Sequence, residues 1–201
     1  MVNIEGNIRY DRAGRWISVG KKIVPITATR FENALKDITS AKSQKPIIVF
    51  LRGRGGGELY PCLKIYGDMR NSEIPIFTVA VDVVFSGFFY ILQTGQKRFA
   101  TQKTKLMFHR TNKFFDNINM NANDLSKERD SLLMFDGTQI KIFCRRGRPV
   151  KRVIELFMKE ATIYPTEARA LKLIDEIIEK DTIKNMCARI RRLASRKKAF
   201  C

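Results

Sequence analysis

The chain has 201 residues, of which 44% are hydrophobic and 29% charged, an ordinary balance for a globular protein with one large core or two small ones. Its four cysteines form no C-x-x-C pair and lie far from the single histidine, so a zinc site is not expected and the thiols suit a reducing compartment. The start of the chain lacks the basic and apolar segments of a signal peptide. We therefore expect a cytoplasmic protein with no metal or cofactor of its own.

The formal net charge is +18, and the isoelectric point is about 10.1. A charge of this sign attracts nucleic acids and other polyanions. The basic residues are nevertheless spread along the chain, and no base-stacking motif or metal finger accompanies them. Solubility and general anion attraction explain the charge at least as well, so nucleic-acid binding is the less favoured alternative.

Hydrophobic periodicity predicts strands and helices that alternate along the chain. Apolar runs indicate strands at 16–19, 46–51, 76–81, 106–108 and 173–178. Apolar residues at helical spacing indicate helices at 30–39, 58–69, 88–92 and 124–145, and from Pro149 and Pro165 onward. Thr29 and Glu32 form a capping-box pattern for the first of these helices, and Thr166 is a candidate cap for the last. The alternation predicts an α/β fold with a mainly parallel sheet.

Two further segments have patterns of their own. Asparagines alternate with apolar residues over 115–123, and a period of two predicts a strand with one polar face. The segment 181–201 combines apolar residues at helical spacing with seven Lys/Arg and one Asp. This combination predicts a basic amphipathic helix that docks on the body of the protein or on a partner.

Residues 74–95 form a 22-residue segment with a single charge, Asp82, and this length would suffice to span a membrane. Pro75 and the break at Ser86-Gly87 instead favour a buried strand followed by a buried helix. Ser86 then lies at a strand-to-helix junction, where the free N–H groups of a helix start favour developing negative charge. Such a serine is a candidate nucleophile, although a serine-glycine pair there is more often only a turn and a helix cap.

Two other features could contribute to the same chemistry. The glycine cluster at 52–57 lies between a predicted strand and a predicted helix, but it has neither the ending of a phosphate loop nor the spacing of a dinucleotide fingerprint. It can still bring bare backbone N–H groups close to a ligand. His109, at the end of the strand predicted at 106–108, is a candidate general base.

Four landmarks occur in order: Gly55-Gly-Gly-Glu-Leu-Tyr-Pro-Cys-Leu-Lys-Ile-Tyr66, Phe85-Ser-Gly continuing to Gly95, Arg98-Phe-Ala with Met107-Phe-His109, and Pro165-Thr-Glu-Ala through Asp175. Together they resemble the Clp protease proteolytic subunit (ClpP) family over residues 15–178. The resemblance implies the ClpP/crotonase fold, an α/β spiral of ββα units with a strand-plus-long-helix handle. It implies one domain over 1–180, with the handle at 113–148, followed by the basic tail at 181–201.

Carried over position by position, the resemblance assigns Ser86 as the nucleophile and His109 as its general base. The third member of the triad, an aspartate in the family, is Glu160 here. Gly57 and Gly87 match the N–H donors of the oxyanion hole.

Other positions concern the substrate. Asn117, Asn119 and Asn121 lie in the region that lines the substrate groove in the family and could bind an extended peptide by strand addition. Bulky Phe88 and Phe89 follow the serine where small residues are usual, and we expect them to narrow the pocket.

The resemblance implies a serine endopeptidase subunit that degrades unfolded proteins inside a homo-oligomeric chamber of heptameric rings. An AAA+ unfoldase would be the partner that uses ATP. A catalytically inactive ClpP-like subunit of a mixed ring is the first alternative, and Glu160 and the Phe88-Phe89 pair favour it. A phage-type capsid-maturation protease is another. An acyl-CoA enzyme of the crotonase type is less favoured because of the Ser86/His109 pair.

Overall fold

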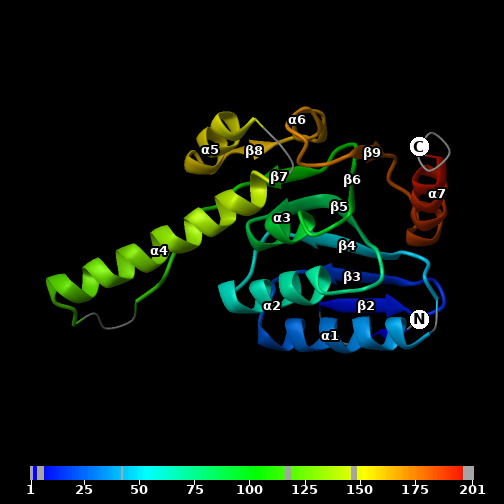
Figure 1. Cartoon of the computed structure of the whole chain (residues 1–201), viewed down its shortest axis with the longest axis horizontal. Helices are drawn as coiled ribbons and strands as arrows, with labels where there is room; N and C mark the ends of the chain where they lie inside the picture. The colour runs from blue at the N-terminus through cyan, green and yellow to red at the C-terminus, as the bar shows by residue number, and fades with distance from the viewer. Residues whose placement is uncertain (1, 4–6, 42, 116–118, 146–148, 197–201) are drawn as a thin grey trace.

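The computed structural model describes residues 2–3, 7–41, 43–115, 119–145 and 149–196. In these ranges nine strands and seven helices alternate along the chain (Figure 1). The strands are β1 (Val2–Asn3), β2 (Ile8–Asp11), β3 (Trp16–Gly20), β4 (Ile47–Gly53), β5 (Ile76–Phe85), β6 (Lys97–Thr101), β7 (Lys105–Met107), β8 (Thr162–Ile163) and β9 (Glu176–Ile178). The helices are α1 (Pro25–Ser40), α2 (Leu59–Arg70), α3 (Gly87–Leu92), α4 (Ala122–Phe143), α5 (Val150–Met158), α6 (Pro165–Ala170) and α7 (Ile183–Arg196).

All nine of these strands belong to one sheet, in the order β1-β2-β3-β4-β5-β6-β9, with β7 paired to β5 and β8 paired to β7. Strands β3, β4, β5, β6 and β9 run parallel, while the β1-β2-β3 edge and the β7-β8 pair are antiparallel. The long strand β5 has two neighbours on one side, because residues 77–80 pair with β6 and residues 83–85 pair with β7. The predicted α/β class with a mainly parallel sheet is confirmed.

Both faces of the sheet are buried, which explains why its central strands are apolar on both sides. Alternate residues of β4 show this arrangement: Ile47 and Val49 pack in the larger core with α1 and α2, while Ile48 and Phe50 pack in a smaller core on the other face. Helix α7 covers this smaller core with three buried residues, Met186, Cys187 and Ile190.

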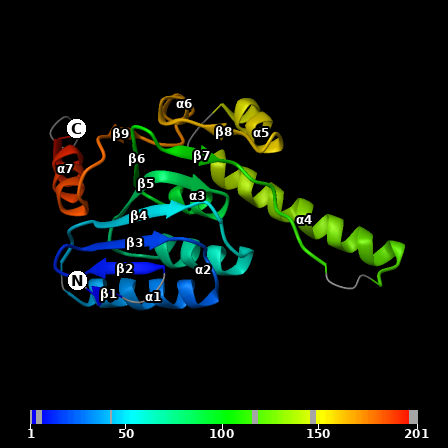
Figure 2. The same ribbon diagram turned by 180° about the vertical axis from the view of Figure 1, so that it is seen from behind.

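Helix α4 extends from the body of the molecule as a long arm, and both chain ends lie toward the opposite end of the molecule (Figures 1 and 2). The helix predicted at 124–145 is therefore confirmed, with slightly earlier bounds. Helix α7 confirms the helix predicted in the basic tail. No helix in the described ranges is both long enough and apolar enough to cross a membrane.

The strand predicted at 115–123 is wrong for the residues that the structure describes there. Residues 119–121 form no strand, and α4 begins at Ala122. The reason is a local cap: the Asn121 side chain accepts hydrogen bonds from the backbone N–H groups of Asn123 (2.9 Å) and Asp124 (3.1 Å). Asn117 lies outside the described residues.

Several predicted boundaries also differ. Helix α1 begins at Pro25, so Thr29 and Glu32 lie inside the helix, and the capping side chain is that of Thr27, which accepts from the N–H of Val24. Thr166 likewise lies inside α6, which Pro165 opens. The β1-β2 hairpin was not predicted, because residues 1–15 are polar and weakly patterned.

Candidate active site

Ser86 lies at the junction of β5 and α3, as the sequence predicts. It has an unusual backbone for a residue with a side chain, with φ 55° and ψ −124°. Its N–H donates a hydrogen bond of 3.0 Å to the carbonyl of Met107 in β7. This sharp turn resembles the strained strand-to-helix elbow that exposes the nucleophile of many hydrolases.

The pairing of β5 with β7 brings His109 to Ser86. In this pairing Phe85 lies opposite Met107, so the residues that follow the two strands lie side by side. The Ser86 Oγ and the His109 Nδ1 are 3.4 Å apart. Two positions 23 residues apart in the sequence are thus close because they follow adjacent parallel strands.

Glu160 lies on the other side of the imidazole, with its Oε1 3.5 Å from the His109 Nε2. It follows α5 and precedes β8, and the antiparallel pairing of β8 with β7 brings it beside the histidine. The same Oε1 accepts a hydrogen bond of 2.9 Å from the N–H of Arg110, which fixes the carboxylate next to the ring.

The imidazole therefore lies between a hydroxyl and a carboxylate, with Nδ1 toward Ser86 and Nε2 toward Glu160. This is the reverse of the usual Ser-His-Asp arrangement, in which Nε2 faces the serine. Both distances are slightly longer than the 2.6–3.2 Å of a catalytic hydrogen bond, as is common in structures without substrate.

The glycine loop lies against the start of α3. Ile23 and Gly57 form a parallel bridge, in which the N–H of Ile23 donates to the Gly56 carbonyl and that of Glu58 donates to the Ile23 carbonyl. The N–H of Gly57 takes no part in this bridge. A Cβ built on Gly87 would lie only 3.6 Å from the Gly57 nitrogen, so the two proposed N–H donors are close together.

Gly56 is a site residue that sequence analysis did not identify. Its φ is +55°, and a Cβ built on it would lie 2.8 Å from the Ser86 Cβ and 3.0 Å from its Oγ. Only a glycine lets this loop approach the serine so closely. A glycine cluster between a strand and a helix is the signal that could have identified it.

Cys62 in α2 lies beneath both proposed N–H donors. A Cβ on Gly57 or on Gly87 would lie 2.6 or 2.5 Å from its Sγ. The side chain is buried, and this burial, with the Glu58 charge as a smaller cause, raises the pKa of the Cys62 thiol to about 12. The thiol is therefore neutral at physiological pH and fills the space behind the two glycines.

These groups line a cleft of about 570 Å³, whose walls come from the glycine loop, α2, α3 and the segment after β7. Phe88 and Phe89 do not line this cleft, so the expected narrowing of the pocket by these side chains is wrong. Both are fully buried, and Phe89 packs on Phe108 and Phe143 in the larger core. The segment of α3 behind Ser86 is a core helix, and of its three aromatic residues only Tyr90 lines the cleft.

Asn119 and Asn121 are exposed and do not line the cleft of this chain. The Asn121 side chain caps α4 instead. A role of Asn117, Asn119 and Asn121 in binding peptide stays a prediction.

Asp136 of α4 supports the segment after His109, and sequence analysis gave no sign of it. Its buried carboxylate accepts hydrogen bonds from the Arg110 Nε (2.9 Å) and the Thr111 N–H (2.7 Å). Gln139, one turn further along α4, donates to the Thr111 hydroxyl at 2.8 Å. The base of the arm thus holds one wall of the cleft. In the part of the chain that the structure describes, no group of three or more His, Cys, Asp or Glu could hold a metal ion.

Comparisons with known proteins agree with this architecture. A family model described as Clp protease matches residues 9–181. The ATP-dependent Clp protease proteolytic subunit 1 of Synechococcus sp. (strain CC9902) is 25% identical over 169 residues, which cover 83% of this chain and 84% of that protein.

Two further relatives carry related names. The ATP-dependent Clp protease proteolytic subunit of Deinococcus radiodurans is 28% identical over 127 residues, covering 62% of this chain and 61% of that protein. The ATP-dependent Clp protease proteolytic subunit-related protein 2, chloroplastic, of Arabidopsis thaliana is 25% identical over 176 residues, covering 85% and 61%. Because the family model matches most of the chain, as the resemblance predicted, this chain belongs to the Clp protease family.

Proposed function

We propose that this chain is the proteolytic subunit of an ATP-dependent Clp-type protease and that it cleaves unfolded proteins as a serine endopeptidase. The observation that supports this most strongly is the position of His109. Its imidazole lies between the Ser86 hydroxyl at 3.4 Å and the Glu160 carboxylate at 3.5 Å, in a chain of the Clp protease family.

In the proposed reaction, Nδ1 of His109 takes the proton of the Ser86 hydroxyl as the oxygen attacks the peptide carbonyl. The Nε2–H faces Glu160, whose carboxylate holds this tautomer and stabilises the imidazolium. The histidine then gives the proton to the leaving amine, and a water molecule repeats the sequence on the acyl-enzyme. The two ring nitrogens exchange the roles that they have in the usual triad. Proton transfer requires only that one ring nitrogen faces the serine hydroxyl and the other faces the carboxylate.

The N–H groups of Gly57 and Gly87 are the proposed donors to the oxyanion. Each such donor typically contributes about 2.7–4 kcal/mol to transition-state stabilisation. Their closeness beside Ser86, with Cys62 packed behind them, supports this role.

Membership of the Clp protease family implies an oligomeric assembly. We propose heptameric rings that enclose a chamber, and an AAA+ unfoldase that uses ATP to feed unfolded chains into it. We also propose a cytoplasmic location, which the buried thiols of Cys62 and Cys187, neither of them in a disulfide, support.

An inactive subunit of a mixed ring is the second candidate. Glu160 favours it, because this side chain replaces an aspartate, is 46% exposed, and also binds the Arg110 N–H. The name of the Arabidopsis relative, which is called subunit-related, also favours it. The Phe88-Phe89 pair no longer does, because both rings lie in the core.

Labelling with a fluorophosphonate probe separates the two candidates. An active site should label the wild-type protein, and labelling should vanish in Ser86→Ala and in His109→Ala, while both variants stay folded by circular dichroism. Absence of labelling in a folded, assembled wild type would favour the inactive subunit. Hydrolysis of an unfolded protein together with an unfoldase then tests the wider function.

A further inference from the structure

We propose that the cleft beside Ser86 selects peptide segments that carry Asp or Glu close to the scissile bond. This preference concerns the substrate of the proposed peptidase site and therefore rests on the proposed function. The cleft lining contains four cationic side chains and one carboxylate. The cations are Lys22, Arg54, Arg110 and Lys113, and the carboxylate is that of Glu58.

Two of these cations already have acidic partners. The Arg110 Nε lies 2.9 Å from the Asp136 carboxylate, and the Lys113 Nζ lies 2.7 Å from that of Glu128. Both carboxylates come from α4. Their charge compensates the wall of the cleft that follows His109 and leaves little attraction there for an anion.

The opposite wall differs. Lys22 and Arg54 are exposed, and no carboxylate of the described residues lies within 4.0 Å of either charged group. The neighbouring Arg52 shows the contrast, because its guanidinium lies 3.0 Å from the Asp82 carboxylate. The arginine on the strand thus forms an ion pair, whereas Arg54, which lines the cleft, forms none with the described residues.

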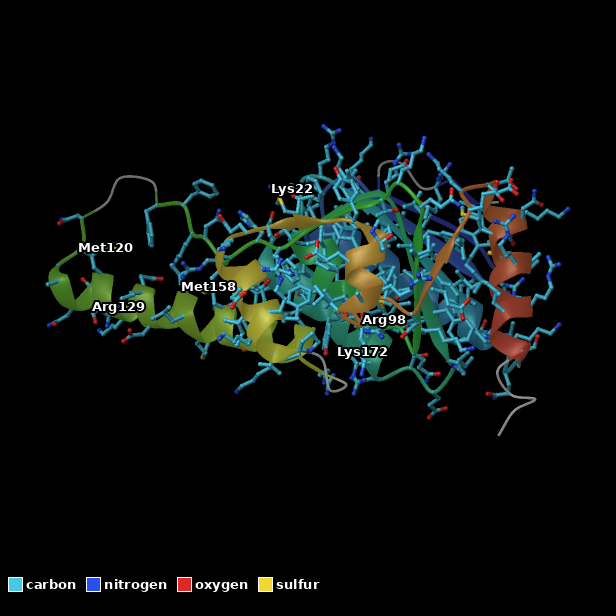
Figure 3. The ribbon with its side chains drawn as sticks, turned by 90° about the horizontal axis from the view of Figure 1, so that it is seen from above. Lys22, Arg98, Met120, Arg129, Met158 and Lys172 are labelled. Atoms are coloured by element: carbon cyan, nitrogen blue, oxygen red, sulfur yellow. The ribbon has the colours of Figure 1, made fainter. Side chains whose placement is uncertain are left out.

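Both cations flank the proposed oxyanion donor. Arg54 precedes Gly57 by three residues, and a Cβ on Gly55 would lie 3.6 Å from the Cβ of Lys22. A peptide whose scissile carbonyl points to Gly57 therefore places its adjacent side chains near these two charges. Figure 3 shows Lys22 on the body of the molecule, well away from the end of α4 that Met120 and Arg129 mark.

The attraction between these two cations and an acidic side chain acts only over a short distance. The net charge of +18 draws any polyanion toward the protein, but a preference between two peptides of equal length depends on the charges beside the cleft. Exposed ion pairs are individually weak and are screened by salt. Two of them together account for a preference of about tenfold at low ionic strength.

Binding to the full-length Ser86→Ala protein measures this preference without hydrolysis. Three fluorescein-labelled peptides of identical length and apolar core would carry Glu, Gln or Lys on both sides of the central bond. We expect the Glu peptide to bind about tenfold more tightly than the Gln peptide at low salt, with the difference largely lost near 1 M salt.

A matched pair of double variants locates the effect. Lys22→Gln with Arg54→Gln should reduce the Glu-over-Gln preference to less than about threefold. Lys151→Gln with Lys184→Gln, two exposed lysines on α5 and α7, removes the same charge and should leave the preference intact.

Equal binding of the three peptides, no binding of any peptide, or an equal loss in both double variants would overturn the proposal. Hydrolysis by the wild-type protein tests the proposed function separately. Equal hydrolysis of all three peptides would support the proposed function and contradict the proposed preference for acidic peptides. Tight binding of the Glu peptide without hydrolysis of any peptide would support the preference and contradict the proposed function.

Discussion

Two members of the proposed triad have a strained backbone, and a glycine beside them shares the same sign of φ. Ser86, Gly56 and Glu160 all have positive φ angles, of 55°, 55° and 49°. For residues with side chains this conformation costs about 1–3 kcal/mol and persists only where the surrounding structure imposes it. Two of the six positive-φ residues other than glycine in the described ranges are members of the proposed triad.

The first prediction concerns Gly56. Gly56→Ala places a Cβ 2.8 Å from the Ser86 Cβ in a left-handed backbone, so Ser86 or the loop must move. We expect fluorophosphonate labelling of Ser86 to slow at least about tenfold, since small displacements at a reacting centre have large effects. Gly55→Ala is the matched control, because its Cβ would meet nothing closer than 3.6 Å. Equal labelling rates in the two variants would contradict this account.

The second prediction concerns Cys62 and pH. Burial raises the pKa of the Cys62 thiol to about 12, above the value of about 8.5 for an exposed thiol. The folded protein therefore keeps a proton that the unfolded chain loses, and this contribution to stability is present below about pH 8.5 and is lost as the pH rises towards 12.

Urea unfolding at pH 7 and pH 9.5 checks this. Wild type should lose more stability over this interval than Cys62→Ala, which lacks the thiol. The half-buried Cys144 provides the control position, because Cys144→Ala should behave as wild type. At pH 8, iodoacetamide should modify Cys144 well before Cys62 in the folded protein.

At the scale of elements, two helices end in the same way. After α5, the N–H of Ala161 donates to the Leu156 carbonyl and that of Glu160 donates to the Phe157 carbonyl. Residues 171–173 repeat this pattern after α6, with Lys172 in the place of Glu160 and a φ of 56°. This is the Schellman motif, in which the left-handed position is usually glycine. A glutamate in this left-handed position lowers the stability of the folded protein. Its contact with His109 in the candidate active site explains why a glutamate occupies the position.

The third prediction compares the two motifs. Lys172→Gly should raise the free energy of unfolding by about 1 kcal/mol and leave fluorophosphonate labelling unchanged. Glu160→Gly relieves the same strain but loses the hydrogen bond from Arg110 and the contact with His109. Its labelling rate should fall at least about tenfold with little loss of stability. Glu160→Gly with full labelling would show that the carboxylate has no part in activating Ser86.

At the scale of the whole molecule, the sheet is covered on both faces while α4 stands away from the body (Figure 1). Leu125, Leu133 and Met134 on this arm are 52%, 51% and 60% exposed. Several exposed apolar side chains on one projecting helix suit a surface that another chain covers. The family to which this chain belongs implies such an assembly.

The fourth prediction tests this surface. Leu133→Glu should lower the native mass, because a buried charge at a subunit interface is strongly unfavourable. Thr138→Glu, an exposed polar position on the same helix, should leave the mass unchanged. Native mass spectrometry or light scattering measures both. A wild-type protein that stays a 23.2 kDa monomer at all concentrations would exclude the chamber.

The sequence by itself determined the class of fold and indicated three features of the candidate site. Apolar runs separated by helical periods predict a buried, mainly parallel sheet, and the break in the apolar segment 74–95 predicts that its hydroxyl residue lies at a strand-to-helix turn. The glycine cluster and the histidine at a strand end carry the same kind of local signal. Where short-range signals compete, as between the alternating asparagines and the Asn121 cap, the pattern alone predicted the wrong element.

Only the tertiary structure decided which of these residues meet. Strand β5 pairs with β6 along its first half and with β7 along its second, and this shift brings His109 rather than any residue after β6 to Ser86. The partners from α2, α4 and the end of α5, which are Cys62, Asp136 and Glu160, reach the site through packing and strand pairing. Such contacts join residues far apart in the chain, and no local periodicity encodes them.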